Sequence, residues 1–186
     1  MKLIRYGRPG AERPGLVDAQ GTLRDLSMLL PDLGPAQLNP RTLAALAAID
    51  ASRLPAVEGS PRLGSPVGGV GKIVCVGLNY ADHAKELGNA IPDTPILFIK
   101  PPSSLRALAD GIVMPQGLGE CHFETELCVR IGMPLKNATR EQAVLAIDGV
   151  TLGLDLTLRD LQNTLKANGH PWERAKAFDG ACLLGE

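Results

Sequence analysis

Aromatic residues are scarce in this chain, and their scarcity limits the partners it can recognise. Phe, Trp and Tyr make up 3% of the 186 residues, with a single tryptophan. Proteins that bind single-stranded nucleic acid stack the bases on such side chains. A net charge of −1 also gives no basic field that would draw the molecule onto nucleic acid or an anionic membrane. We therefore expect neither partner.

Long apolar runs and paired metal-binding cysteines are also missing. No run approaches the roughly 20 apolar residues of a membrane span, and the stretch after Met1 is too short for the core of a signal peptide. The four cysteines, at positions 75, 121, 128 and 182, form no Cys-x-x-Cys pair and match no zinc-ligand spacing. We interpret them as small buried residues in a reducing compartment, which predicts a cytoplasmic protein.

The chain is nevertheless 45% hydrophobic, which is enough for a core, and the pattern of its apolar residues changes near residue 70. Before that point, two short apolar runs indicate a hairpin, and apolar residues at helical spacing follow Asn39-Pro40. Residues 52–71 are rich in Pro, Gly and Ser and read as a connector. We predict a small N-terminal domain with its linker at 1–69 and a main domain at 70–186.

The main domain shows patterns of both strands and helices. Continuous apolar runs at 73–76 and 96–99 are typical of buried strands, a further strand is expected at 150–156, and residues 123–131 alternate in polarity. Helices are expected over 80–87, 140–147 and 158–168.

Two carboxylates lie at alternate positions of the expected strand 123–131. Glu124 and Glu126 then share one face of the strand, where like charges repel unless a cation lies between them. Asp155 is a third carboxylate inside an apolar run, where an ionised group needs a partner. Ligands that are all oxygen favour Mg²⁺ or Ca²⁺. The alternative is a Glu pair on a solvated strand face without any metal.

A histidine and a glutamate are spaced three residues apart in the expected helix 80–87. His83 and Glu86 would share a face of this helix, so that the carboxylate could orient the imidazole as a general base for water. The alternative is a solvated helix in which Asp82, Lys85 and Glu86 pair with one another.

Five segments, in order and spacing, resemble the fumarylacetoacetate hydrolase family. They are KIVCVGLNYADH at 72–83, PILFIKP at 95–101, HFETEL at 122–127, DLTLRDLQ at 155–162 and AKAFD at 175–179. Residues 1–69 are similar to the N-terminal extension of longer bacterial members. The resemblance implies a mixed α+β fold of the α/β class, namely the family's β-roll with a small N-terminal domain. Because relatives continue beyond the position of Glu186, we expect an incomplete roll, truncated at its C-terminus.

The resemblance also implies roles for particular residues. It implies a divalent metal, usually Mg²⁺ with Mn²⁺ or Ca²⁺ as alternatives, held by Glu124, Glu126 and Asp155. It implies a catalytic dyad and a catalytic lysine, which are His83, Glu86 and Lys176. Substrate contacts are expected from Tyr80, Arg159 and Gln162. His122, beside the metal-binding strand, is the next candidate base should His83 not serve.

The activity that the resemblance implies is Mg²⁺-dependent cleavage of a C–C bond in acylpyruvate-like 2,4-dioxo acids. Such substrates are of the fumarylpyruvate or fumarylacetoacetate type and belong to the catabolism of aromatic compounds or sugar acids. Chelation of the 2-oxo acid would polarise its carbonyl and stabilise the enolate that forms when the bond breaks. Alternatives are a 2-oxo acid decarboxylase, a 2-hydroxy-diene-dioate isomerase and a catalytically silent fragment. We expect a small-molecule oxo acid as partner, and a homodimer.

Overall fold

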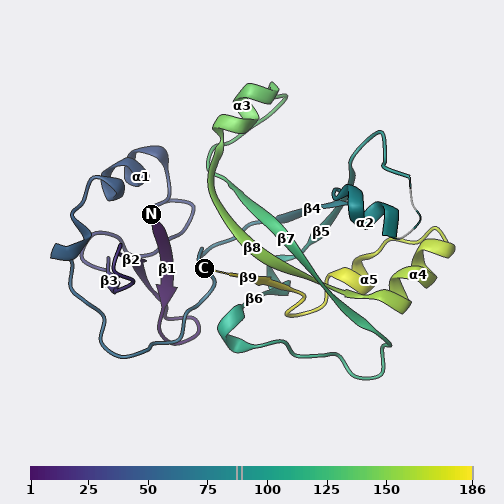
Figure 1. Ribbon diagram of the computed structural model, residues 1–186, viewed down its shortest axis with the longest axis horizontal. Coiled ribbons are helices and arrows are strands. Elements are labelled where there is room, and N and C mark those ends of the chain that lie inside the picture. The colour runs from purple at the N-terminus through teal and green to yellow at the C-terminus, as the bar shows by residue number, and fades with distance from the viewer. Residues whose placement is uncertain (87, 89, 186) are drawn as a thin grey trace.

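The computed structural model describes residues 1–86, 88 and 90–185, with the side chains at 83, 84 and 86 outside the described part. Its mixed α and β elements form a smaller N-terminal region and a larger region that follows it (Figure 1). Among the residues described, no helix combines the length and the apolar character needed to cross a membrane.

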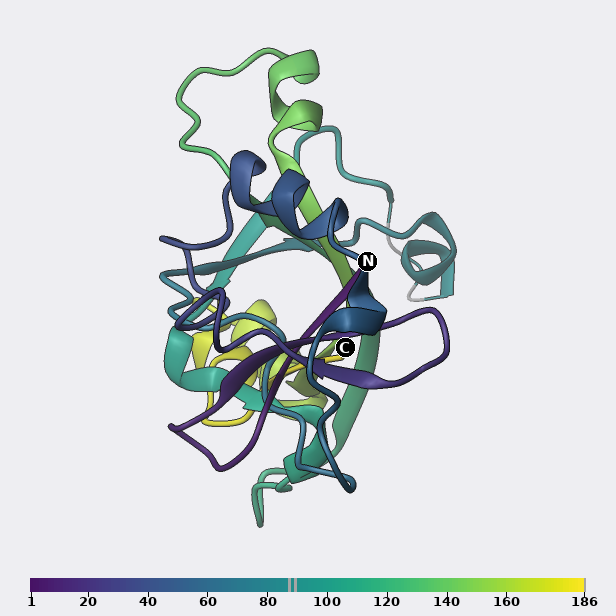
Figure 2. The ribbon, with the colours of Figure 1, turned by 90° about the vertical axis from the view of Figure 1, so that its left-hand side faces the viewer.

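The N-terminal region consists of a small antiparallel sheet and short helices. Its elements are β1 (Lys2–Tyr6), β2 (Arg13–Val17), β3 (Leu23–Asp25), α1 (Pro40–Ala47) and the 3₁₀ turn η1 (Ala51–Arg53). The sheet order is β1-β2-β3, and Figure 2 shows this region in front of the rest of the chain. The expected hairpin and helix are both present.

Helix α1 begins where the sequence predicts it. The side chain of Asn39 accepts a hydrogen bond from the backbone N–H of Thr42, and Pro40 occupies the first turn. This cap satisfies a donor that the helix itself leaves unpaired, while the proline needs no such partner. Leu46 on the helix then packs against Leu16 and Leu26 in the core of this region.

The larger region begins with a two-stranded antiparallel pair. Strands β4 (Ile73–Gly77) and β5 (Ile96–Lys100) pair from Ile73 opposite Lys100 to Gly77 opposite Ile96, and α2 (Ala81–Glu86) connects them. The prediction that both strands are fully buried was wrong. Val74, Leu97 and Ile99 are 51%, 62% and 52% exposed, because in the described structure only one face of this pair is covered.

The second sheet of this region has the order β6-β9-β8-β7. Its strands are β6 (Leu105–Ala107), β7 (Cys121–Ile131), β8 (Ile147–Leu158) and β9 (Cys182–Leu184). Strand β6 runs parallel to β9, and the other neighbours are antiparallel. Strand β8 is longer than the predicted 150–156 because it pairs with β7 along almost its whole length.

Short helices complete this region. They are η2 (Pro102–Ser104), η3 (Leu108–Asp110), α3 (Arg140–Leu145), α4 (Arg159–Ala167) and α5 (Glu173–Lys176). Helix α3 connects β7 to β8 at one end of their ribbon, whereas α4 and α5 lie toward the opposite end (Figure 1). The end of the ribbon opposite α3 is therefore the place where strands β7 and β8, helices α4 and α5 and the core residues meet.

Candidate metal centre

The register of the β7–β8 ribbon brings the three predicted ligands together. Glu124 lies opposite Asp155, and Glu126 lies opposite Gly153. Because directly opposite residues of antiparallel strands point to the same face, all three carboxylates share one face. One oxygen from each lies within 4.8 Å of the others. A Cβ at position 153 would come 2.6 Å from the sulfur of Cys128, so any larger residue there would force that side chain to move.

Cations from two helices neutralise part of this cluster. The Lys176 ammonium, on α5, donates to Oε2 of Glu124 at 2.5 Å and to Oδ2 of Asp155 at 2.7 Å. Arg159, at the start of α4, donates to Oε1 of Glu124 and, at 2.6 Å, to Gln162. Burial raises the pKa of Glu124, but Lys176 and then Arg159 outweigh it and bring that pKa to about 2. Glu124 is therefore ionised at any ordinary pH.

Glu126 has the opposite environment. Burial, followed by the negative charge of Asp155, raises the pKa of Glu126 to about 7, and Glu124 adds to the rise. The donor set is oxygen only, and a cation between these groups would relieve their repulsion. The residues present therefore fit a divalent metal ion.

A second buried lysine lies behind the cluster, and the sequence analysis did not identify it. Lys100 is only 1% exposed, and its ammonium lies 2.8 Å from Oδ1 of Asp155. A signal for it exists in the alternation of β5, where Ile96 and Phe98 point inward and Lys100 follows on the same face. The carboxylate it contacts is 55 residues away, so only the folded chain reveals the pairing.

The three predicted substrate contacts and the predicted catalytic lysine surround the same cluster. Tyr80, Arg159, Gln162 and Lys176 line a cavity of about 40 Å³ together with the three carboxylates. The Tyr80 hydroxyl accepts a hydrogen bond of 3.0 Å from the backbone N–H of Leu127, which ties the start of α2 to β7. The structure thus brings these predicted residues to one place, while their roles stay predictions.

One wall of this cavity is aromatic, which the sequence analysis did not foresee. The rings of Phe98 and Trp172 are 5.8 Å apart, and the Lys166 ammonium lies 4.9 Å from the centre of the Trp172 ring. The only signal in the sequence is that Trp172 is the single tryptophan. Its place beside the carboxylates depends on the packing of α5 against β5.

The predicted dyad lies outside the described residues. Helix α2 spans positions 83 and 86, but the side chains of His83 and Glu86 are not described. The alternative base, His122, has both ring nitrogens engaged. Nδ1 accepts from Arg159 at 3.3 Å, and Nε2 lies 3.2 Å from a carboxylate oxygen of Glu120. His122 is thus held at the rim by its neighbours, and it does not line the small cavity.

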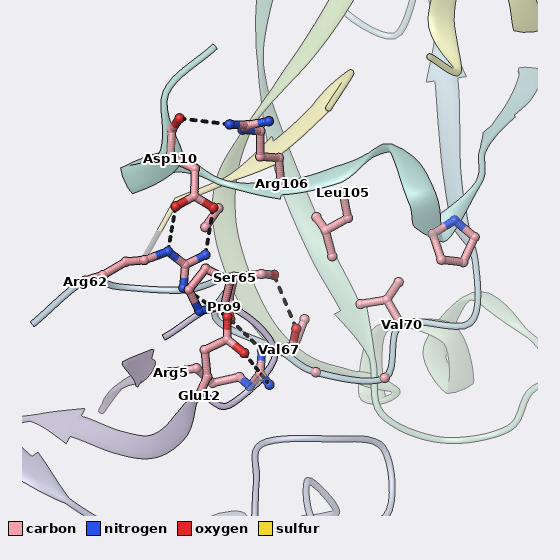
Figure 3. Close-up of a pocket in the computed structure, with 14 residues that line it drawn as sticks. Arg5, Pro9, Glu12, Arg62, Ser65, Val67, Val70, Leu105, Arg106 and Asp110 are labelled. Atoms are coloured by element: carbon pink, nitrogen blue, oxygen red, sulfur yellow. Dashed lines mark hydrogen bonds and ion pairs between the residues drawn. The ribbon is translucent and has the colours of Figure 1, made fainter. Parts of the chain in front are cut away.

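A larger cavity, of about 760 Å³, lies between the N-terminal region and the segment from β6 to η3 (Figure 3). Its charged side chains are engaged with one another. Arg62 binds Asp110 at 2.5 Å and Glu12 at 2.9 Å, and Arg5 lies 3.6 Å from Glu12. None of the three clustered carboxylates lines it. The small cavity is therefore the better candidate site, because it holds the reactive groups.

Comparison with known proteins identifies the family of the chain. Residues 72–186 match the family model described as fumarylacetoacetate (FAA) hydrolase C-terminal. A Burkholderia multivorans protein named "Putative hydrolase" is 44% identical over 179 residues, which cover 96% of this chain and 62% of that protein. The chain thus spans less than two thirds of this relative's length.

Solved structures agree in fold. The fumarylacetoacetate hydrolase of Exiguobacterium antarcticum is 27% identical with a TM-score of 0.69, over 98% of this chain and 64% of that one. The fumarylpyruvate hydrolase of Pseudomonas aeruginosa, solved with Mn²⁺ and pyruvate, is 34% identical with a TM-score of 0.57, over 69% and 56%. These likenesses confirm the predicted mixed α/β fold class. The chain therefore belongs to the fumarylacetoacetate hydrolase family.

Proposed function

We propose that this chain forms the metal centre of a Mg²⁺-dependent hydrolase that cleaves a C–C bond in acylpyruvate-like 2,4-dioxo acids. The observation that carries the proposal is the cluster of Glu124, Glu126 and Asp155, whose oxygens lie within 4.8 Å of one another in a lined cavity. Mn²⁺ and Ca²⁺ are the alternative cations, and the related fumarylpyruvate hydrolase was solved with Mn²⁺ and pyruvate.

The charges around the cavity favour an anionic substrate. The three carboxylates contribute −3, and three cations lie in direct contact with them, namely Lys100, Lys176 and Arg159. When Glu126 is ionised, as it would be beside a bound cation, these charges cancel one another. A bound divalent cation would therefore leave the site positive, which suits a 2-oxo carboxylate, and would polarise its carbonyl and stabilise the charge that develops on the oxygen.

The protein's own side chains then divide the remaining tasks. The Lys176 ammonium faces the cavity, so it can donate to the substrate carboxylate once it no longer bridges Glu124 and Asp155. Arg159 holds Gln162 at 2.6 Å, which fixes an amide group beside the substrate. The rings of Phe98 and Trp172 exclude water on one side. His83, oriented by Glu86, is the proposed base that removes a proton from the attacking water.

Loss of dioxo-acid absorbance with Mg²⁺ tests this proposal. An acylpyruvate should be consumed with Mg²⁺ present and should not be consumed after chelation with EDTA. Oxaloacetate and a 2-hydroxy-diene-dioate run in parallel distinguish the alternatives. Consumption of oxaloacetate alone would favour the decarboxylase. Isomerisation of the 2-hydroxy-diene-dioate alone would favour the isomerase. Metal binding without turnover of any of these compounds would favour the catalytically silent fragment.

We also propose that the chain works as a homodimer in the cytoplasm. The support for the dimer is the apolar face of the β7–β8 ribbon, where the cross-strand pair Leu127 and Leu152 is 60% and 61% exposed. Apolar surface of this kind is covered in most stable proteins. The cytoplasmic location rests on the reducing compartment inferred from cysteine usage.

A further inference from the structure

The ammonium group of Lys100 is enclosed by backbone oxygens from three separate segments. It donates to the carbonyl of Leu156 at 3.4 Å, to that of Ala181 at 2.9 Å and to that of Lys176. These carbonyls belong to β8, to the segment before β9 and to the end of α5. An ammonium has three N–H groups, so these carbonyls offer an acceptor for each of them. Lys100 thus joins β5 to the three segments that carry Asp155 and Lys176.

The same ammonium lies 2.8 Å from Oδ1 of Asp155. At this distance the contact is a buried ion pair, and it is shorter than the contact of the same ammonium with the carbonyl of Leu156. The other oxygen, Oδ2, accepts from Lys176 at 2.7 Å. Two lysines therefore hold the two oxygens of one carboxylate, and Lys100 holds the one that faces the interior.

We propose that Lys100 is a positioning residue that orients Asp155 for metal binding. This inference rests on the proposed metal site. Asp155 is only 5% exposed, and a fixed positive charge beside it offsets the cost of burying its carboxylate. Lys100 supplies that charge from a place that cannot reach solvent, and its carbonyl contacts prevent it from turning away. The carboxylate is then already directed toward the face that it shares with Glu124 and Glu126 when a cation arrives.

Orientation and simple electrostatics predict opposite results when the charge is removed. A positive charge near a cation binding site repels the cation, so electrostatics alone would make metal binding tighter in a neutral variant. Orientation predicts weaker binding, because Asp155 loses the group that holds one of its oxygens in place. Outer-shell partners of metal ligands typically account for about 10–100-fold in metal affinity. The sign of the change therefore decides between the two.

Titration calorimetry with Mn²⁺ on the full chain provides the test. Lys100→Gln keeps N–H donors for the carbonyls but removes the charge, and Lys100→Met removes both. We expect both to bind Mn²⁺ at least about tenfold more weakly than the unchanged protein. Lys166→Met is the matched control, since the Lys166 ammonium lines the same cavity but lies over the Trp172 ring. Its affinity should be unchanged or slightly higher.

A stability measurement without metal distinguishes two roles of Lys100, namely positioning Asp155 and only holding the backbone carbonyls together. Urea unfolding of Lys100→Gln, Asp155→Asn and the double variant gives the coupling between the two residues. We expect the double variant to lose clearly less stability than the sum of the single losses, because an uncharged Asn no longer needs the lysine charge. Additive losses would show that Lys100 only holds the carbonyls and would overturn the proposal.

The remaining outcomes are also decisive. Unchanged or tighter Mn²⁺ binding by both folded Lys100 variants would overturn the positioning role while leaving the metal site intact. If neither variant folds by circular dichroism, Lys100 is a structural clamp and the role is rejected. If the unchanged protein binds neither Mn²⁺ nor Mg²⁺, the proposed function fails instead, and the coupling in urea still decides whether Lys100 acts on Asp155.

Discussion

The two faces of strand β7 differ in burial, and the difference is the opposite of what is usual in a protein sheet. On one face Glu124, Glu126 and Cys128 are partly buried. On the other, Phe123 and Leu127 are 73% and 60% exposed. Ordinarily the apolar face of a strand packs on the core and the polar face meets water. Here the charged face lies inside and much of the apolar face lies outside.

The difference follows from what lies against each face. The charged face is covered by β5 and the helices α4 and α5, which bring Lys100, Arg159 and Lys176 to the carboxylates. The apolar face is covered only at its inner end, where Leu156 packs with Ala181 and Leu183. Burial of a charge is tolerated when partners of opposite sign are fixed beside it. The comparison shows that neighbours, and not polarity alone, decide which face is covered.

Substitution of the proposed base should have the largest effect on the charged face. In protein that turns over an acylpyruvate, His83→Ala should lower kcat by roughly 10²–10⁴-fold, the usual contribution of a positioned general base. Mn²⁺ affinity should hardly change, because His83 is assigned to water. Loss of substrate absorbance gives the rate and calorimetry gives the affinity. Full activity of His83→Ala would contradict the dyad and make His122 the next candidate.

Removal of a ligand should have the next largest effect. Glu126→Ala should weaken Mn²⁺ binding by about 10²-fold or more, since it removes one of three charged oxygen ligands. Thr125→Ala is the control, because Thr125 is exposed on the opposite face of the same strand. Calorimetry on both variants makes the comparison. Equal affinity in the two variants would remove Glu126 from the metal centre.

A charged substitution on the apolar face of β7 should affect the oligomeric state of the protein. If a second copy covers this face, Leu127→Asp should weaken dimerisation by about 30-fold, as expected for a residue central to an interface. Met28→Asp is the control, because Met28 is 89% exposed but belongs to the N-terminal region. Light scattering after size-exclusion chromatography gives the mass. A monomer in all three proteins would contradict the dimer.

The effect of pH on stability and on Mn²⁺ affinity should be smaller, but it reports directly on the protonation of Glu126. Burial and then the charge of Asp155 raise its pKa to about 7 in the metal-free fold, above the ordinary value of 4.5. Ionisation of Glu126 therefore destabilises this fold, so its contribution to stability is lost as the pH rises from 4.5 through 7. Below pH 7, protons also compete with the cation, and Mn²⁺ affinity should fall by up to about tenfold per pH unit.

Glu126→Gln sharpens this prediction. The variant should melt at a higher temperature than the unchanged metal-free protein at pH 7.5, and at a similar temperature at pH 4.5. Glu124 cannot cause this difference, because its pKa of about 2 places its titration well below that range. Differential scanning calorimetry at the two pH values makes the measurement. A variant that is less stable at pH 7.5 would contradict the predicted environment of Glu126.

Much of this site could be predicted from local patterns. The alternation in 123–131 correctly placed Glu124 and Glu126 on one face of a strand, and Asn39-Pro40 correctly marked the start of α1. Both are short-range properties, set by the two-residue repeat of a strand and by the capping of a helix end. The resemblance of five segments to one family then placed Asp155 with the two glutamates.

Only the tertiary structure decided the rest. It showed that Lys100 from β5 lies behind Asp155, that Gly153 leaves room opposite Glu126 and that Trp172 forms a wall of the cavity. It also showed that Leu97 and Ile99 face outward although their run reads as a buried strand. The sequence by itself determined which side chains share a face, because that follows from the geometry of the backbone. What each face meets depends on contacts between segments far apart in the chain, and no local pattern carries that information.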